Sequence, residues 1–278
     1  MALTIYNNPF RNSCYIQLIY LVDSSDEKIE RLSWQAQLKD MRLYDSPAVK
    51  LLSMLTSKNP PHLVLLGKSG AGKGTLAKML SKKYGYVHIS IGDLHRAENQ
   101  KGTELGLRIR KLVQENKIVS QEMTEITFKM LSGVIDEILR NKKTFILDNF
   151  PTYPMQIPFI LEVMDKYKLK NRVIIIVPEL PDNEALKRLT NRVVCSLSSC
   201  GRGFNLLSVP PKEKDKCDSC GSKLMRRIDD EPAIIQNKRL PFYRDNIAPV
   251  VNQLAEKIDL FFLNDIFGLF QKYLGLSI

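Results

Sequence analysis

A glycine-rich segment between an apolar run and a helical pattern constrains the fold of this chain more than any other feature. Its nine residues, Gly67 to Thr75, read Gly-Lys-Ser-Gly-Ala-Gly-Lys-Gly-Thr. Leu63 to Leu66 precede it as a candidate strand, and Leu76 to Leu80 follow it as the start of a helix. Glycines let consecutive backbone N–H groups turn inward around an anion, and the N-terminus of the following helix adds a positive dipole end. The sequence therefore predicts a phosphate-binding loop.

The residues inside this loop have distinct expected roles. Lys73 supplies a positive charge for the β- and γ-phosphates of a nucleotide. In the general form of such loops Ser or Thr directly follows the lysine, whereas here Gly74 intervenes and Thr75 carries the hydroxyl. The residues expected to surround the phosphates are Gly70, Ala71, Gly72, Lys73, Gly74 and Thr75.

The charge balance of the chain fits an anionic partner. The 278 residues carry a formal net charge of +11, which suits nucleotides, nucleic acid or an acidic surface. No apolar run approaches the roughly 20 residues of a membrane span, so we expect no membrane partner. The first 22 residues include Arg11 and no acidic residue, which is a weak sign of organelle targeting. We expect a cytoplasmic protein, with an organelle such as the mitochondrion left open.

The chain divides into an extension and a main domain. Residues 25–57 have a helical pattern that breaks near Asp45-Ser46-Pro47, so we assign 1–58 to an N-terminal extension and 59–278 to the main domain. Nearly continuous apolar strands separated by helical stretches are typical of a parallel sheet with both faces covered. This predicts an α/β fold. The candidate strands are His62–Leu66, Thr144–Leu147, Arg172–Val177 and Ile258–Leu263.

Two pairs of cysteines interrupt this rhythm between Val193 and Met225. Four thiolates can surround a tetrahedral zinc ion, and such an ion stabilises an insertion too small for a core of its own. The second pair has the two-residue spacing of a zinc knuckle, while the first pair has a four-residue gap. A lobe without metal, reduced cysteines packed in a loop and a redox dithiol are the alternatives. The predicted zinc ligands are Cys195, Cys200, Cys217 and Cys220.

The loop and the motifs after it resemble the adenylate kinases and their nucleoside monophosphate kinase relatives, from about His62 to the C-terminus. The resemblance implies a P-loop NTPase-type parallel sheet flanked by helices, with two inserted lobes. One, at about 90–119, binds the acceptor monophosphate, and the other, at about 191–231, is a zinc-bearing lid. It also implies ATP with Mg²⁺ as the donor. Catalysis is then positioning plus converging positive charge on the transferring phosphoryl group.

The resemblance assigns roles to residues outside the loop. His88 to Arg96 looks like the start of the monophosphate-binding lobe, and Ile146 to Pro151 looks like the strand end whose aspartate, Asp148, joins Thr75 in the magnesium shell. Arg227 to Asp230 looks like the closing motif of the lid. The implied monophosphate-binding residues are Ile91, Arg96, Val119 and Gln156.

Several basic residues complete the implied site. Arg188 lies beside the adenine of ATP, whereas Arg192 and Arg227 act on the transferring phosphate with Lys73. Arg239 resembles the final catalytic arginine, with Lys238 as a rival because one extra residue separates it from Asp230.

The chain departs from the family pattern where the acceptor binds. Ile91 replaces the usual threonine, Asn149 the usual glycine and Thr152 the usual arginine. Thr152 removes a bidentate phosphate contact that a neutral hydroxyl does not replace. The donor half of the pattern is intact.

Three interpretations follow from this mixture. The first is a working nucleoside monophosphate kinase, converting ATP and AMP to two ADP with a divergent acceptor pocket. The second is an ATP-binding relative with little or no transfer activity, retained as a subunit of a larger assembly. The third is a nucleic-acid-associated protein that uses its basic surface and the extension 1–58.

Overall fold

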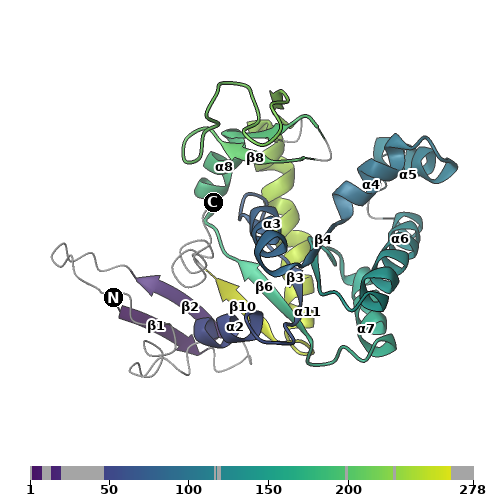
Figure 1. Cartoon of the computed structure of the whole chain (residues 1–278), viewed down its shortest axis with the longest axis vertical. Coiled ribbons are helices and arrows are strands. Elements are labelled where there is room, and N and C mark those ends of the chain that lie inside the picture. Colours follow the sequence, from purple (N-terminus) through teal and green to yellow (C-terminus); the bar gives the residue numbers. More distant parts are fainter. Residues whose placement is uncertain are drawn as a thin grey trace.

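The computed structural model describes residues 2–7, 14–19, 47–115, 117, 120–197, 200–227 and 230–263. The helical pattern predicted before residue 47 lies outside these ranges, as does the predicted binding residue Val119. The body of the molecule is a sheet with helices on both faces, and two lobes project from one end of it (Figure 1).

The sheet confirms the expected α/β architecture. Five neighbouring strands, β10-β6-β3-β5-β4, are all parallel, and β3 lies in the middle with Val64 opposite Leu147 on one side and Ile175 on the other. Strand β2 extends the sheet parallel to β10, and β1 pairs with β2 antiparallel. The strands are β1 (Ala2–Asn7), β2 (Cys14–Ile19), β3 (His62–Leu65), β4 (Val87–Ser90), β5 (Phe145–Asp148), β6 (Val173–Pro178) and β10 (Leu260–Leu263).

Helices cover both faces of the sheet (Figure 1). Helices α2 (Pro47–Leu55) and α3 (Lys73–Tyr84) pack on one face, and α6 (Gln121–Arg140), α7 (Ile157–Lys166) and α11 (Ala248–Leu254) pack on the other. Because successive strand residues point to opposite faces, β3 contributes alternately to two hydrophobic cores. This arrangement explains why the strands read as continuous apolar runs.

Part of the predicted extension belongs to this packing. Leu51 and Leu55 of α2 are 0% and 1% exposed, and they contact the core formed by Leu63, Leu65 and Leu76. The segment 47–55 is therefore built into the sheet's second core, although the sequence placed it before the main domain.

The first lobe is a pair of helices, α4 (Ile91–Gln100) and α5 (Glu104–Gln114). The two helices approach closely at Gly106, where an added Cβ would lie 2.4 Å from the carbonyl oxygen of Glu98. A side chain at this position would push the helices apart, so the glycine fixes the compact shape of the lobe.

The second lobe follows α8 (Asp182–Thr190). Its core is a small antiparallel sheet in the order β8-β7-β9, formed by β7 (Arg192–Cys195), β8 (Gly203–Asn205) and β9 (Leu224–Met225). We call residues 191–231 the lid.

A continuous helical rod from Pro232 to Leu254 leads back from the lid to the body. It contains two π-helical turns, Ile235–Arg239 and Tyr243–Ile247, each of which ends two residues before a proline. A proline ring clashes with the carbonyl of the preceding turn, and a wider turn accommodates that clash. Within the described part of the chain, no helix is both long and apolar enough to cross a membrane.

Candidate active site

The glycine-rich loop has the conformation that phosphate binding needs. Gly70 and Gly72 have φ angles of 86° and 87°, in the left-handed region, and Gly72 precedes the first residue of α3. Space is also limiting, because a Cβ on Gly70 would lie 3.2 Å from Leu189 Cγ and 3.3 Å from the carbonyl oxygen of Ala185. The loop therefore depends on glycine for conformation as well as for close packing against α8.

Lys73 lies inside the loop. Its Nζ donates hydrogen bonds to the carbonyl oxygens of Gly67 at 2.7 Å and Lys68 at 3.0 Å. Burial lowers the pKa of Lys73 to about 8; Asp148 opposes this change, while Arg239 and Arg192 add to it. The ammonium group is thus held among other cations, in a place where an anion would relieve the repulsion.

Asp148 ends β5 next to the loop. Its Oδ2 lies 3.2 Å from His88 Nε2 of the neighbouring strand β4, and a Cβ on Gly74 would lie 3.4 Å from the same oxygen. The other oxygen, Oδ1, is buried and has no hydrogen-bond partner among the described residues. A buried carboxylate oxygen without a partner fits a site for a hydrated cation.

The contact with His88 was not expected from the sequence. Strand β4 was missed as well, because three of its four residues were interpreted only as part of a motif. Parallel pairing of β4 with β5 places Ser90 opposite Asp148, and this pairing brings His88 into reach.

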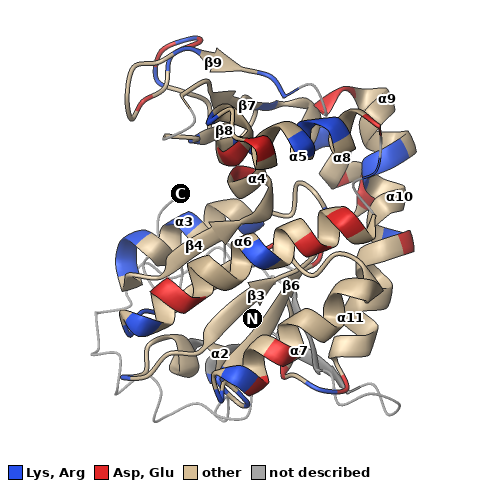
Figure 2. Cartoon of the chain, turned by 90° about the vertical axis from the view of Figure 1, so that its right-hand side faces the viewer, with Lys and Arg blue, Asp and Glu red and all other residues tan. Residues whose placement is uncertain are grey.

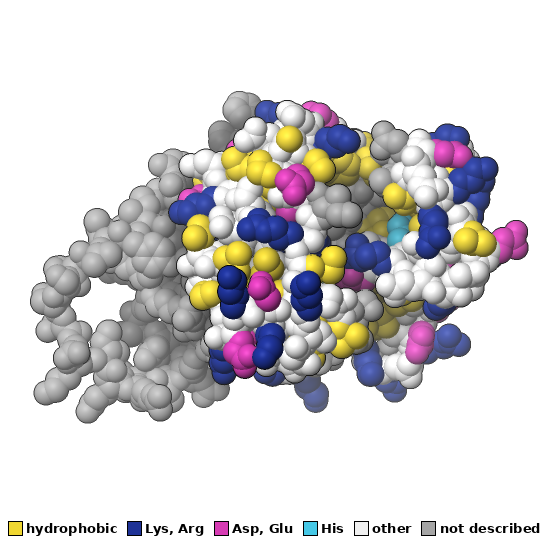
Figure 3. Space-filling model, turned by 90° about the horizontal axis from the view of Figure 1, so that it is seen from above, with side chains coloured by type: hydrophobic (Ala, Val, Ile, Leu, Met, Phe, Trp, Pro, Cys, Tyr) yellow, Lys and Arg dark blue, Asp and Glu magenta, His cyan; other side chains and the backbone are white. Residues whose placement is uncertain are grey.

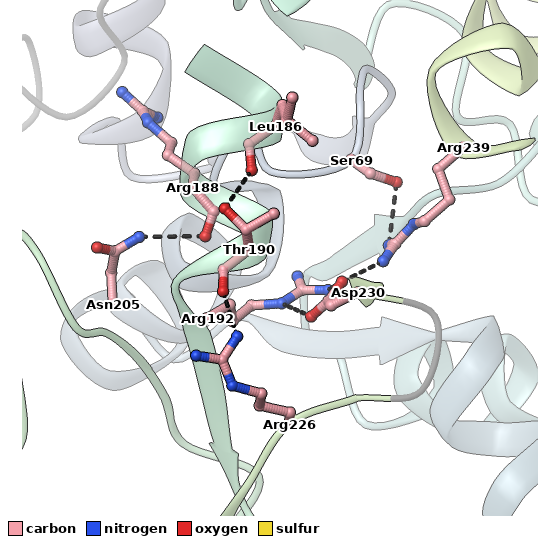
Figure 4. Close-up of polar contacts among 9 residues, drawn as sticks. All are labelled: Ser69, Leu186, Arg188, Thr190, Arg192, Asn205, Arg226, Asp230 and Arg239. Atoms are coloured by element: carbon pink, nitrogen blue, oxygen red, sulfur yellow. Dashed lines mark hydrogen bonds and ion pairs between the residues drawn. The ribbon is translucent and has the colours of Figure 1, made fainter. Parts of the chain in front are cut away.

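Two arginines converge on one buried carboxylate (Figure 4). Arg192 donates two hydrogen bonds to Asp230, at 2.8 and 2.7 Å, and Arg239 donates another to the same side chain, which is 2% exposed. Arg239 also donates to Ser69 Oγ in the loop at 3.1 Å. We call Arg192, Arg239 and Asp230 the arginine cluster.

The other predicted basic residues are not part of the arginine cluster. Lys238, the rival of Arg239, is exposed, and Arg227 is half-buried. The exposed side chain of Arg188 points away from the arginine cluster (Figure 4). The structure thus brings together Lys73, Asp148 and the arginine cluster, with Arg188 at a distance from them.

A cavity of about 290 Å³ opens between α4, α6 and the end of β5. We call it the α4 cavity. Among the residues that line it, none is Lys or Arg. It is lined by Ser90, Ile91, Gly92, His95, Met123, Thr127, Asp148, Asn149, Phe150, Thr152, Tyr153, Gln156 and Phe242.

Two of the four predicted monophosphate-binding residues line this cavity. Ile91 and Gln156 line it, and the Arg96 guanidinium folds over Gly92, where an added Cβ would lie 3.1 Å from its Nη1. Arg96 is paired with Asp93 and has 59% of its side chain exposed. Arg96 therefore lies next to a residue that lines the cavity.

Two of the three departures from the family pattern, Asn149 and Thr152, can be described from the structure. Asn149 has a φ of 60°, a left-handed conformation that asparagine tolerates better than most residues do. Thr152 is buried, and its N–H and hydroxyl lie 2.8 and 3.3 Å from Gln156 Oε1. The same oxygen accepts from the N–H of Tyr153 at 3.3 Å. These contacts fix which end of the Gln156 amide is oxygen.

The four predicted metal ligands meet in the lid. Their Sγ atoms all lie within 4.8 Å of one another, with Cys195 and Cys220 at 3.4 Å and Cys200 and Cys217 at 3.7 Å. Sulfur atoms around a tetrahedral zinc ion are about 3.8 Å apart, whereas a disulfide brings them to about 2.05 Å. The arrangement fits a metal ion and excludes these pairs as disulfides.

Together these features define a class of protein. A phosphate-binding loop opens a helix from the central strand of a parallel sheet, basic residues converge on it, and two lobes flank it, as expected of a P-loop phosphotransferase that encloses its substrates.

Comparison with known proteins identifies the family. A family model described as "Adenylate kinase" matches residues 65–258. An adenylate kinase of Petrotoga mobilis is 34% identical over 190 residues, which cover 68% of this chain and 83% of that protein. Those of Archaeoglobus fulgidus and Treponema denticola are 36% and 38% identical, and the matches cover 70% of this chain and 87% and 88% of those proteins. The chain belongs to the adenylate kinase family.

Family membership makes the chain a nucleoside monophosphate kinase, as the sequence motifs predicted. It favours this interpretation over an inactive subunit or a nucleic-acid-associated protein. On the face shown in Figure 2, Lys and Arg segments alternate with Asp and Glu segments along the helices.

Proposed function

We propose that the chain transfers the γ-phosphoryl group of ATP to AMP, with the reacting groups placed between the glycine-rich loop, the arginine cluster and the α4 cavity. One observation carries the assignment. Asp230 holds Arg192 and Arg239 together, and both lower the pKa of Lys73, so three cations converge where phosphates would lie. Such convergence suits a transition state whose negative charge is spread over several oxygens.

The proposed roles follow from position. The loop N–H groups of Gly70 to Gly74 cradle the donor phosphates, Lys73 contacts the β- and γ-phosphates, and Arg192, Arg227 and Arg239 stabilise the transferring group. Thr75, at the exposed start of α3, and Asp148 suit the shell of Mg²⁺, which when bound neutralises charge on the donor phosphates. Arg188 is proposed to lie beside the adenine of ATP.

We further propose that the four lid cysteines hold zinc. Hydrogen bonds from Ser222 lower the pKa of the exposed Cys220 to about 6, which favours the thiolate that metals bind. Burial acts in the opposite direction on Cys195 and raises its pKa to about 12, which a bound cation would offset. The ion would contribute to folding of the lid, whose own hydrophobic core is small.

The acceptor half is proposed to be weaker than the donor half. Arg96 is the basic residue at the rim of the α4 cavity, and Thr152 offers only a neutral hydroxyl already bonded to Gln156. We therefore expect transfer to AMP with a raised KM for AMP and an ordinary KM for MgATP.

A coupled assay tests the proposal directly. Purified protein is incubated with ATP, Mg²⁺ and, in separate reactions, AMP, GMP, CMP or UMP, with Lys73→Met as the inactive reference. Formation of ADP from ATP and AMP, absent in Lys73→Met, is the expected result. Absence of transfer to all four monophosphates, with ATP still bound, would overturn the proposal in favour of a non-catalytic relative.

A further inference from the structure

His95 is a cavity-lining residue whose protonation is fixed by its neighbours. It lies on α4, half-buried, with Nε2 3.0 Å from Oγ1 of Thr127 on α6. Thr127 is buried, and its hydroxyl lies 2.7 Å from the carbonyl oxygen of Met123, one turn earlier on the same helix. A hydroxyl has one proton, and the carbonyl can only accept it. Thr127 must therefore accept from His95, so Nε2 of His95 carries the hydrogen and Nδ1 carries a lone pair.

The surroundings keep this imidazole neutral. Burial lowers the pKa of His95, and Arg96 lowers it further. The other titratable groups around the cavity are Tyr153 in its lining, Asp93 on α4, His88 on β4 and Asp148 on β5, whereas α6 contributes the uncharged Met123 and Thr127. Within the described ranges, Nδ1 of His95 has no hydrogen-bond partner. The side chain therefore offers one neutral acceptor at the wall of the cavity.

Gln156 offers a hydrogen-bond donor to the cavity, whereas His95 offers an acceptor. Its Oε1 already receives the N–H groups of Thr152 and Tyr153 and the Thr152 hydroxyl, so both of its lone pairs are in use. Its amide NH₂ has no partner among the described residues, although the side chain lines the cavity. Gln156 is therefore available as a donor, but its oxygen is not available to a ligand.

We propose that His95 reads the acceptor base, its Nδ1 accepting a hydrogen bond from the exocyclic amino group of adenine while Gln156 donates to a ring nitrogen. Adenine carries an amino donor beside ring-nitrogen acceptors, which complements this pair, whereas a 6-oxo purine would face Nδ1 with another lone pair. This inference rests on the proposed function and deepens it. His95 is then the residue that selects a 6-amino purine over a 6-oxo purine.

Kinetics with three acceptors test the assignment. AMP, IMP, which has an oxygen in place of the amino group, and purine riboside 5′-monophosphate, which has only hydrogen there, are compared in wild type and His95→Leu. We expect His95→Leu to raise KM for AMP about tenfold, with kcat and KM for MgATP unchanged, because a contact made equally in ground and transition states is lost. The ratio of kcat/KM for AMP over IMP should fall at least tenfold. Gln100→Leu, at an exposed position of the same helix, is the matched control.

Two polar variants separate base reading from a structural role. His95→Asn places its side-chain oxygen where Nδ1 was and gives up the contact with Thr127. His95→Gln keeps a group near Thr127 and leaves the Nδ1 position empty. Base reading predicts that Asn retains the preference for AMP over IMP and that Gln loses it, while a structural role predicts the reverse order. This comparison also decides the question if His95→Leu does not fold.

Failure of the His95 inference can be distinguished from failure of the proposed function. If wild type uses AMP and His95→Leu keeps the wild-type ratio of AMP over IMP, the acceptor is elsewhere, for example the backbone carbonyl of Asn149, and only this inference is overturned. If wild type transfers to no monophosphate, the proposed function fails. Calorimetric titration of AMP and IMP then decides the inference, which equal affinities for the two would overturn.

Discussion

Lys73 donates hydrogen bonds to carbonyl oxygens of its own loop. Arg239 and Arg192 destabilise its charged form and so lower its pKa. Nζ donates to the carbonyl oxygens of Gly67 and Lys68, and in the proposed function phosphate oxygens would replace these partners. Its pKa of about 8 therefore belongs to the state without nucleotide. The same residue should change its protonation when a polyanion binds.

Binding of MgATP should therefore take up protons at alkaline pH. With a pKa of about 8 in the free protein, Lys73 is largely neutral at pH 8.5 and largely charged at pH 7, and bound phosphates raise its pKa. We expect uptake of up to about 0.8 proton at pH 8.5 and about 0.1 at pH 7. Calorimetry in buffers of different ionisation enthalpy measures this. Lys73→Met should bind without uptake, and equal uptake in that variant would assign the proton to another group.

Thr152 offers a test of the weakened acceptor half. Thr152→Arg should raise kcat/KM for AMP about tenfold, because a guanidinium adds a charge-assisted contact to the monophosphate. The backbone N–H of residue 152, which donates to Gln156 at 2.8 Å, is retained in the variant. Thr152→Met supplies similar bulk without charge. An equal gain in Thr152→Met would show that bulk, and not charge, improves the reaction.

At the scale of elements, the sequence predicted those strands, loops and metal ligands that a short run of residues identifies by itself. The glycine-rich loop, the central strands and the four cysteines are each readable because their residue types have few other uses at those spacings. Strand β4 and the two π-helical turns were missed. The strand has only four residues, half-buried apart from Ile89, and the turns arise from prolines that a sequence pattern reads as breaks.

In the candidate site, the sequence predicted only those residues to which a family motif gives a role. His88, Ser69 and His95 were not assigned, because their contacts depend on strand pairing or on helix packing across 60, 170 and 32 residues of sequence. All three residues lie within motifs of the sequence, but no motif gave them a role. The position of His95 next to Arg96 in the sequence was the signal that could have identified it.

The lid should behave as a metal-dependent element. Cys217→Ser removes a buried sulfur from the four-cysteine cluster, so we expect loss of about one zinc per chain. Protease cleavage should then increase within 191–231, with the sheet remaining folded because its cores do not include the lid. Metal analysis and limited proteolysis with mapped cleavage sites measure both effects. Cys14→Ser, on β2, is the matched control, and zinc absent from wild type purified without chelator would contradict the prediction.

At the scale of the whole molecule, the body positions two lobes around the site. Seen from above, α4 and α5 form a lobe separated from the lid by a hollow, with Lys and Arg side chains on both sides of it (Figure 3). Lys78 of α3 donates to the carbonyl oxygen of Gly201 at 2.6 Å, which joins the lid to the helix that follows the loop.

The position of the boundary between the N-terminal extension and the main domain depends on whether α2 folds together with the sheet. Leu51 is 0% exposed and packs with strand residues from β3 and β6 in the core under α3. Leu51→Ala should lower the free energy of unfolding by about 2 to 5 kcal/mol, because it leaves a cavity in that core.

Denaturant unfolding followed by far-UV circular dichroism and by MgATP-dependent activity measures this loss. If α2 is part of the cooperative unit, both midpoints should fall together, whereas Leu107→Ala, at a position 55% exposed on α5, should change neither by more than about 0.5 kcal/mol. An unchanged activity midpoint in Leu51→Ala would instead mean that the domain folds and works without α2. The boundary would then lie near residue 58, as the sequence pattern placed it.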